Sequence, residues 1–285
     1  MIDLLYSQGE TARYICRKIY RYYTYYNIPK ELDDTIISEM AATFTSNNFK
    51  IQPVLEELFK STHFYEADTG VTDDSYGGII KSPLDLVLGT IKFFNIQMPD
   101  YVSSTETYYE TSGDLLKKMK AQGMEFYEPI EVAGYPPYHQ YPAFNRNWIS
   151  TNYLTRRYEF IRKTMSMMNM DEPGAIYIDI LTYVKSNVPD AIAADAKSLI
   201  IHLAKYLLPM ADNLTFDADA DDGADITTER LNYFLQAFLY NPQLDIDPEA
   251  AWTERYTHNY DSEVRQRQLE NLLNAMLQSP EYQLM

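Results

Sequence analysis

Apolar residues recur at helical spacing through most of this chain, and the alternating runs that form strands are almost absent. The clearest example is one face of a single segment, formed by Leu84, Val87, Leu88, Ile91 and Phe94. This spacing is typical of an amphipathic helix with one side in a core. We therefore expect an all-α fold, an irregular globular array of many helices with little or no β-structure and a proline- and tyrosine-rich loop at its centre.

Capping residues indicate where two of these helices begin. Ser7, with Glu10 three residues later, has the pattern of a capping box. Ser82 precedes a proline, Pro83, and an acid, Asp85, which is the order expected at the first turn of a helix. Further helical patterns cover 29–46, 53–59, 151–167, 175–185, 191–208, 228–240 and 262–277.

The middle of the chain is less clearly patterned. A short helix is expected over 114–122, with Gly123 as its C-terminal cap, whereas 100–113 is polar and gives no clear signal. No repeat with a fixed period is visible, so a regular solenoid is not expected. We expect one all-α domain over 1–285, and 100–130 is where a subdivision would fall.

Charge narrows the classes of partner. The 285 residues carry a formal net charge of −17, and a negative field of that size repels nucleic acids and anionic membranes. We expect no nucleic acid partner, while cations, neutral sugars and basic protein surfaces remain open, and solubility alone could explain the charge. No stretch is apolar enough for a transmembrane segment. The single cysteine, Cys16, excludes an intrachain disulfide and a cysteine metal cluster.

The segment from Glu131 to Arg157 is rich in prolines and aromatic residues. It joins prolines to several of the 26 tyrosines, a tryptophan and one of the four histidines. Prolines fix a loop at low entropic cost, and aromatic and amide side chains on such a loop can form a preorganised contact surface. The candidate ligand-binding residues are Tyr135, Tyr138, His139, Tyr141, Arg146, Asn147, Trp148 and Asn152. In the alternative interpretation these aromatics fill the core beneath an irregular loop.

An acidic run from Asp217 to Asp225 resembles part of a calcium-binding loop. Asp217, Asp219 and Asp221 have the spacing of the first three ligands of an EF-hand. The glycine that such a loop requires comes one residue late, at Gly223, so a solvated acidic loop is the alternative. The histidines have no neighbouring metal ligands, and no phosphate-binding loop or nucleophile elbow is present. We expect no metal site, no cofactor and no catalytic residues.

Five stretches occur together in one order: ETARYICRKIYRYY, VLEELFKSTHFYEAD, IKSPLDLVLGTIKFF, EVAGYPPYHQYPAFNRNWISTNYLTRR and LLNAMLQSPEYQLM. This set resembles the C-terminal half of a bacterial family catalogued as domain of unknown function 1800, in particular its Bacteroidetes members. Tyr135 stands where the family usually has tryptophan.

The resemblance implies a chain that corresponds to part of a longer protein. Full-length members often carry export signals and are encoded beside a secreted protein of sulfatase-like fold. It therefore implies a periplasmic, cell-envelope or secreted location, although no signal peptide is recognisable in this chain. The family supplies no catalytic residues.

These observations favour a non-enzymatic binding or assembly module that contacts a protein partner or a glycan through the aromatic loop at 135–152. One alternative is a hydrolase-like enzyme that uses His139 with an unidentified carboxylate. Another is a glycan-binding protein similar to tyrosine-rich outer-membrane receptors.

Overall fold

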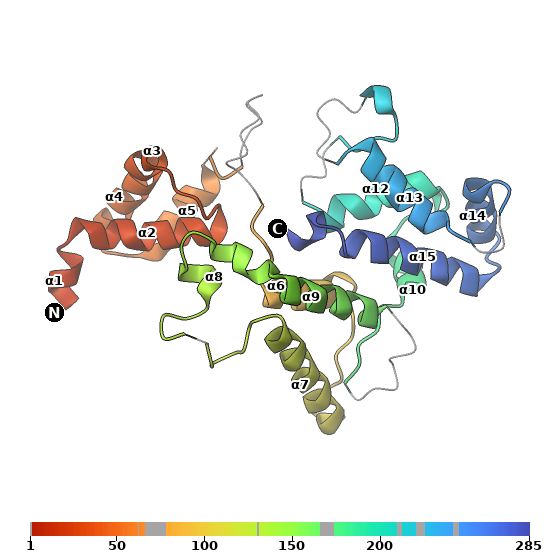
Figure 1. The fold of residues 1–285 in the computed structure, drawn as a ribbon, viewed down its shortest axis with the longest axis horizontal. Helices are drawn as coiled ribbons and strands as arrows, with labels where there is room; N and C mark the ends of the chain where they lie inside the picture. Colours follow the sequence, from red (N-terminus) through yellow and green to blue (C-terminus); the bar gives the residue numbers. More distant parts are fainter. Residues whose placement is uncertain are drawn as a thin grey trace. The chain divides into compact units, whose positions relative to one another are not determined.

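The computed structural model describes residues 2–61, 63–65, 78–129, 131–165, 174–209, 213–220, 226–241 and 245–285. Within these ranges the regular structure is helical and no strand forms; an isolated antiparallel bridge joins Ile80 and Leu284. The predicted all-α fold is confirmed (Figure 1).

The chain divides into two compact units. Unit 1 comprises 1–79 together with 133–145, and unit 2 comprises 80–132 together with 146–285. The chain therefore leaves the first unit, returns to it for a short segment, and leaves it again. A single domain over 1–285 stays a prediction.

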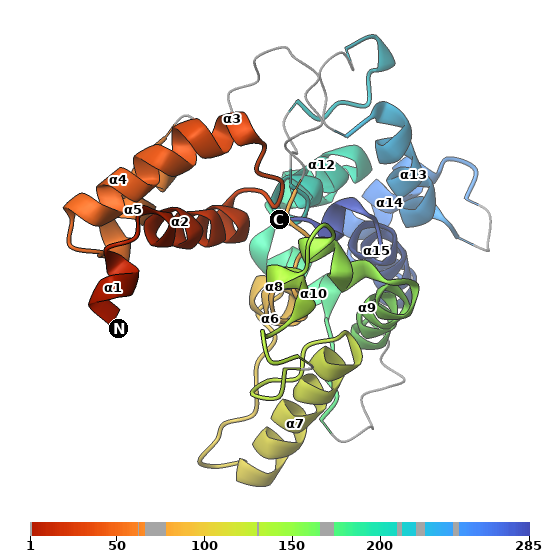
Figure 2. The ribbon, with the colours of Figure 1, turned by 60° about the vertical axis from the view of Figure 1, so that its left-hand side comes forward.

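Unit 1 is built from short helices around a small core. Its helices are α1 (Ile2–Tyr6), α2 (Gly9–Tyr23), α3 (Lys30–Leu32), a π-helical turn (Asp33–Ile37), α4 (Ser38–Ser46), α5 (Ile51–Lys60) and α8 (Pro136–His139). Figure 2 shows α2 beside α4, and the two are in contact. The face of α2 predicted from its spacing is buried at Ala12, Cys16 and Tyr20, against Met40 and Phe44 of α4. Burial raises the pKa of the Cys16 thiol to about 11.

Unit 2 contains the larger core. Its helices are α6 (Pro83–Phe93), α7 (Thr105–Ala121), α9 (Thr151–Thr164), α10 (Ile180–Asn187), α11 (Asp190–Ala193), α12 (Ala196–Leu207), α13 (Thr228–Leu239), α14 (Pro248–Thr257) and α15 (Ser262–Leu277). Helix α15 lies beside α13 (Figure 1) and buries Leu269, Leu272 and Leu273 completely. The indole nitrogen of Trp252 donates to the carbonyl of Ala193 at 3.0 Å, which satisfies the one polar atom of this buried ring.

The last residues of the chain are bound into unit 2. The backbone N–H of Lys81 donates to the carbonyl of Gln283 at 2.8 Å, and the Lys81 ammonium donates to the carbonyl of Tyr282 at 2.7 Å. The buried Tyr282 hydroxyl lies 2.8 Å from the hydroxyl of Thr90 in α6. These bonds join the C-terminal 3₁₀ turn (Glu281–Gln283) to the start of the unit.

The local predictions had mixed outcomes at helix N-termini. The capping box at α6 is confirmed, since Asp85 N–H donates to the Ser82 hydroxyl at 3.2 Å and Ser82 N–H donates to Asp85 at 3.1 Å. The prediction for Ser7 is wrong: α2 begins after Gln8, and the Ser7 hydroxyl donates instead to the carbonyl of Leu4 at 2.8 Å. A short preceding helix, α1, supplies that carbonyl.

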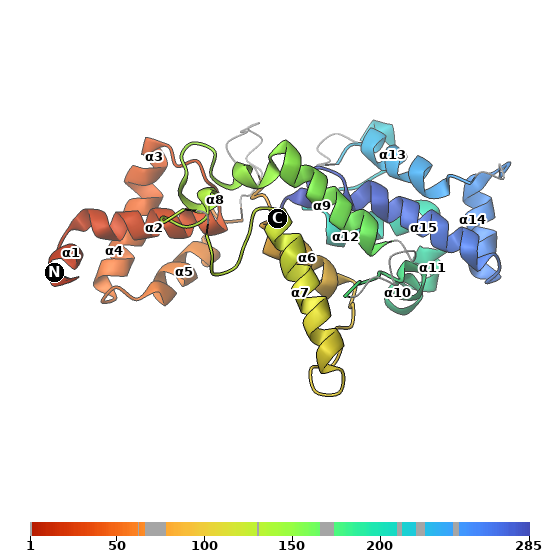
Figure 3. The ribbon, with the colours of Figure 1, turned by 60° about the horizontal axis from the view of Figure 1, so that its bottom comes forward.

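Helix α7 is longer than predicted, because it begins at Thr105 within the polar stretch 100–113. Only one side of α7 is buried, at Thr111, Leu115 and Met119, and the helix extends away from the other helices of unit 2 (Figures 2 and 3). Gly123 ends it as predicted, with φ of 97° and a bond from its N–H to the carbonyl of Lys120.

Candidate functional site

The structure distributes the eight predicted site residues over the two units. Tyr135, Tyr138, His139 and Tyr141 belong to unit 1, and Arg146, Asn147, Trp148 and Asn152 belong to unit 2. The division falls between Asn145 and Arg146, inside the 3₁₀ turn Phe144–Ile149. Each half is therefore described within its own unit.

In unit 1 the tyrosines of the returning segment meet the C-terminal end of α2. The ring centroids of Tyr22 and Tyr138 are 6.2 Å apart, those of Tyr135 and Tyr138 are 6.4 Å apart, and those of Tyr22 and Tyr23 are 4.7 Å apart. Tyr22 is 53% exposed, Tyr138 is 44% exposed and Tyr141 is 82% exposed. We call Tyr22, Tyr23, Tyr138 and Tyr141 the aromatic surface of unit 1.

Phe144 holds this segment against α2. It is buried, with its ring centroid 6.2 Å from that of Tyr26 and 6.2 Å from that of Tyr141. The guanidinium of Arg21 lies 4.8 Å from the Phe144 ring and donates to the carbonyl of Tyr26 at 3.3 Å. Burial lowers the pKa of Arg21. A cation over an aromatic face adds attraction to the area that the ring buries.

Local sequence explains the shape of the returning segment. Pro136 lies at the first position of α8, where its fixed φ suits a helix and its missing N–H costs nothing. The N–H of Gln140 donates to the carbonyl of Pro136 at 2.7 Å, and the N–H of Phe144 donates to the carbonyl of Gln140 at 2.9 Å. The Tyr141–Pro142 peptide bond is cis. The two hydrogen bonds of Gln140 and Phe144 fix the backbone of this segment.

The four predicted site residues of unit 2 differ in how exposed their side chains are. Trp148 is only 2% exposed and is one of the largest fully buried side chains, which is the core role considered for the aromatics. Arg146 and Asn152 are exposed, and Asn147 is half-buried. Because the buried Trp148 contributes to stability, replacing it would not separate an effect on binding from an effect on folding.

The histidines of the described chain lie in separate places. His139 is half-buried in α8. The ring of His63 bonds the Tyr20 hydroxyl at 2.8 Å, and burial lowers its pKa. The ring of His258 lies 3.1 Å from the carbonyl of Glu254. Across the described ranges, no group of three or more histidine, cysteine or acidic side chains is arranged to hold a metal ion.

The predicted acidic loop is only partly described. Asp217 and Asp219 are exposed, and the Asp219 N–H donates to the carboxylate of Asp217 at 3.1 Å. Residues 221–225, which would supply the remaining ligands, lie outside the described residues. The expectation that this acidic loop holds no metal ion therefore stays a prediction.

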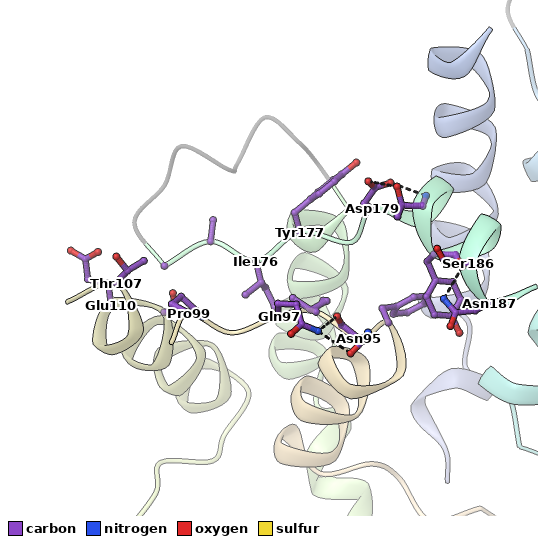
Figure 4. A pocket seen from close by; sticks show the side chains of 17 residues that line it. Asn95, Gln97, Pro99, Thr107, Glu110, Ile176, Tyr177, Asp179, Ser186 and Asn187 are labelled. Atoms are coloured by element: carbon purple, nitrogen blue, oxygen red, sulfur yellow. Dashed lines mark hydrogen bonds between the residues drawn. The ribbon is translucent and has the colours of Figure 1, made fainter. Parts of the chain in front are cut away.

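A pocket of about 690 Å³ lies in unit 2 and contains none of the predicted site residues (Figure 4). Four stretches form it: the residues after α6, the first turns of α7, the extended residues that lead into α10, and α10 itself. Gly174 lies at its edge, with φ of 78°, and a Cβ there would come within 2.7 Å of the Glu110 carbonyl. Only glycine allows this close approach.

Polar groups in this pocket are held by local bonds. The Gln97 amide donates to the side chain of Asn95 at 2.9 Å, and Asp179 caps α10 by accepting from the N–H of Thr182 at 3.0 Å. Glu110 and Asp179 lie toward opposite ends of the pocket in Figure 4. Hydroxyl, amide and tyrosine groups between them suit a polar ligand.

The hydroxyl of Tyr177, which lines the same pocket, belongs to a hydrogen-bond chain with α15. It accepts from the Gln266 amide at 2.7 Å and donates to Glu270 at 3.4 Å. Burial, reinforced by Glu270, raises the pKa of Tyr177 to about 12, so this phenol stays protonated at neutral pH. Sequence reasoning missed this pocket because its lining comes from α7, from α10 and from the connections beside them, and their meeting depends on how these elements pack. The N-cap pattern of Asp179 was the one local signal.

None of the helices in the described ranges combines the length and the apolar run that crossing a bilayer takes. No curated protein and no solved structure matches the chain. The model of one family, described as Protein of unknown function (DUF1800), matches residues 1–284, which is essentially the whole chain. This confirms the family that the five ordered motifs indicate, and the match is not confined to a C-terminal half. The chain belongs to the DUF1800 family of proteins of unknown function.

Proposed function

We propose that this protein is a non-enzymatic assembly module that binds a partner protein through the aromatic surface of unit 1. The observation that carries the proposal is the approach of Tyr22 and Tyr138, whose ring centroids lie 6.2 Å apart while about half of each side chain stays exposed. Two segments far apart in sequence thus contribute to one surface.

The composition of this surface favours a protein as its partner. The surface consists of tyrosines, and tyrosine is one of the residue types, with tryptophan and arginine, that most often dominate binding energy at protein interfaces. A tyrosine presents a large area and a hydroxyl while losing only two side-chain torsions on binding. The prolines of 136–142 and the bonds of Gln140 and Phe144 fix the backbone in advance, which lowers the entropic cost of association.

The family resemblance supports the class of partner and the location. It suggests a companion of sulfatase-like fold encoded beside the gene, and a periplasmic, cell-envelope or secreted pair. The net charge of −17 favours a companion whose docking face is basic, because complementary charge speeds encounter.

Binding to the purified sulfatase-like companion tests the proposal. We expect Tyr138→Ala and Tyr22→Ala each to weaken the equilibrium affinity at least about tenfold, the loss expected of interface tyrosines. Tyr206→Ala is the matched control, because Tyr206 in α12 is 62% exposed and belongs to unit 2.

Circular dichroism would show that each variant is folded. The proposal fails if folded Tyr138→Ala and Tyr22→Ala bind the companion as tightly as the unchanged chain, or if the unchanged chain does not bind it.

A further inference from the structure

Helices α13 and α15 form a second hollow in unit 2, on the side away from their shared core. Their apolar faces are buried against each other and their neighbours, at Leu231 and Phe234 of α13 and at Leu269 and Leu272 of α15. Other residues of the same two helices, together with residues that directly follow each helix, line an open groove of about 450 Å³. This volume is within the range of small-ligand sites.

The groove has one side of tyrosines and one side of amides. Tyr233 and Ala237 of α13 and Tyr240, the residue directly after its end, recur at spacings of four and three, so they lie along one side of the helix. Asn271 and Asn274 of α15 and Gln278, the residue directly after its end, recur at spacings of three and four. The small side chain of Ala237 leaves room between the two tyrosines.

The tyrosines are available to a ligand. Tyr233 is 52% exposed and Tyr240 is 65% exposed. A tyrosine ring offers an apolar face and a hydroxyl at its edge. The C–H face of a sugar ring can stack on such a surface, while each amide opposite offers donors and an acceptor to hydroxyl groups.

The groove carries no uncompensated charge among its lining residues. Its one ionisable lining group besides the tyrosines is Arg230, whose Nε and Nη2 donate to the two carboxylate oxygens of Glu281 at 2.9 Å each. This ion pair also holds the guanidinium 5.8 Å from the Tyr233 ring. A neutral ligand is therefore favoured over an anion, which would have to compete with Glu281 for Arg230.

Part of the amide side is already ordered. The Gln278 amide donates to the side-chain oxygen of Asn274 at 3.0 Å, one turn away on α15. Both residues are half-buried, which restricts their side chains further. A ligand that bonds to side chains already held in place binds at a lower entropic cost.

We propose that the α13–α15 groove binds a neutral oligosaccharide, with sugar rings stacked on Tyr233 and Tyr240 and hydroxyls bonded to Asn271, Asn274 and Gln278. This site is separate from the aromatic surface of unit 1 and does not depend on the partner protein.

The test is calorimetric titration of the full chain with neutral cello-, xylo-, malto- and chito-oligosaccharides, and with an oligogalacturonate as the anionic comparison. At least one neutral oligosaccharide binds at millimolar concentration or below, and raising the salt concentration leaves its affinity unchanged. Tyr233→Ala and Tyr240→Ala each weaken binding about tenfold or more. Tyr206→Ala and Tyr138→Ala, outside the groove, leave it unchanged.

A second kind of variant tests the groove without removing either tyrosine. Ala237→Trp fills the groove while retaining every lining group that contacts the sugar, and it abolishes binding in a folded protein. The proposal is overturned if no neutral oligosaccharide binds, if only the anionic one or an extended peptide binds, or if folded Tyr233→Ala and Ala237→Trp bind as the unchanged chain does. Loss of companion binding in Tyr138→Ala, with sugar binding intact, separates this site from the assembly surface.

Discussion

Arg157 donates a hydrogen bond from Nε to the side-chain oxygen of Gln283 at 3.1 Å, and so joins the middle of α9 to the last turn of the chain. Both side chains are buried, and Arg157 also donates to the carbonyl of Lys81. Burial lowers the pKa of Arg157 to about 10, yet it stays charged at neutral pH. A single guanidinium thus connects three distant parts of unit 2.

Replacing this arginine should destabilise the protein strongly. We expect Arg157→Ala to lower the free energy of unfolding by about 2–4 kcal/mol, because it removes the donor to the Lys81 carbonyl and to the side-chain oxygen of Gln283. Urea unfolding followed by circular dichroism measures this. Arg156→Ala is the control: Arg156 is exposed and pairs with Glu159 on the surface, so its loss should cost less than about 0.5 kcal/mol. Equal effects of the two variants would contradict this role of Arg157.

Replacing two glycines of unit 2 with alanine should have opposite effects on stability. Gly123 has φ of 97°, and a Cβ there would lie 2.8 Å from the ring of Tyr153, so Gly123→Ala should destabilise by about 1–3 kcal/mol. Gly113 lies within α7 with no atom near the place of a Cβ, so Gly113→Ala should stabilise by about 0.5–1 kcal/mol. Thermal unfolding of both variants tests the pair, and a stabilising Gly123→Ala would contradict a left-handed backbone at the end of α7.

The stability of unit 2 should depend on the charge of Lys81. Burial, with a smaller contribution from Arg157, lowers the pKa of Lys81 to about 8. Between about pH 8 and 10 the unfolded chain binds a proton that the folded chain has released, so the contribution of Lys81 to stability rises with pH.

Lys81→Met should remove this dependence. The unfolding free energy of the unchanged chain minus that of the variant is expected to increase from pH 7 to pH 10, by an amount on the order of 2 kcal/mol. Because other titrating groups are shared, the difference isolates Lys81. A difference that stays flat or falls with rising pH would contradict the burial of this ammonium.

Asp33 should make the stability of unit 1 sensitive to acid. Its carboxylate accepts from Arg17 Nε at 2.5 Å and from Arg13 Nη2 at 2.7 Å, and the bond from Arg17 is the main cause of its lowered pKa. The lowered pKa means that this stabilisation is present above about pH 4 and is lost as pH falls through the folded pKa.

Asp33→Asn should therefore cost about 1–2 kcal/mol at pH 7 and progressively less below pH 4. Asp34→Asn is the control, since Asp34 is exposed and lies 3.3 Å from Arg13 at the edge of the same cluster. Thermal unfolding at pH 7 and pH 3 compares them. A cost of Asp33→Asn that persists unchanged at pH 3 would contradict the ion-pair account.

Local signals in the sequence predicted much of the helical structure. Ser82 and Gly123 act at helix ends as their residue types indicate, because caps are satisfied within a few residues. The same logic could have found α14, which the sequence analysis missed: Asp247 precedes Pro248 and accepts from the N–H of Ala250 at 3.1 Å. Ser7 was assigned wrongly because a short helix precedes it and offers the Leu4 carbonyl as a competing partner.

The candidate sites depended on contacts that no local pattern encodes. The tyrosines of 135–141 were predicted as a surface, but their meeting with Tyr22 follows from the return of 133–145 to unit 1. Trp148, a few residues later, is buried in the other unit. The groove residues Tyr233 and Asn274 lie on helices that were predicted, yet their pairing depends on how α13 and α15 pack.

Hydrogen–deuterium exchange of the chain, alone and bound to the sulfatase-like companion, tests the assembly role most directly. The account predicts slower exchange in the bound state in two peptides, one covering 20–26 and the other covering 135–144, with the α13–α15 groove unchanged. Protection confined to unit 2, or no protection in either peptide when the complex is saturated, would contradict it.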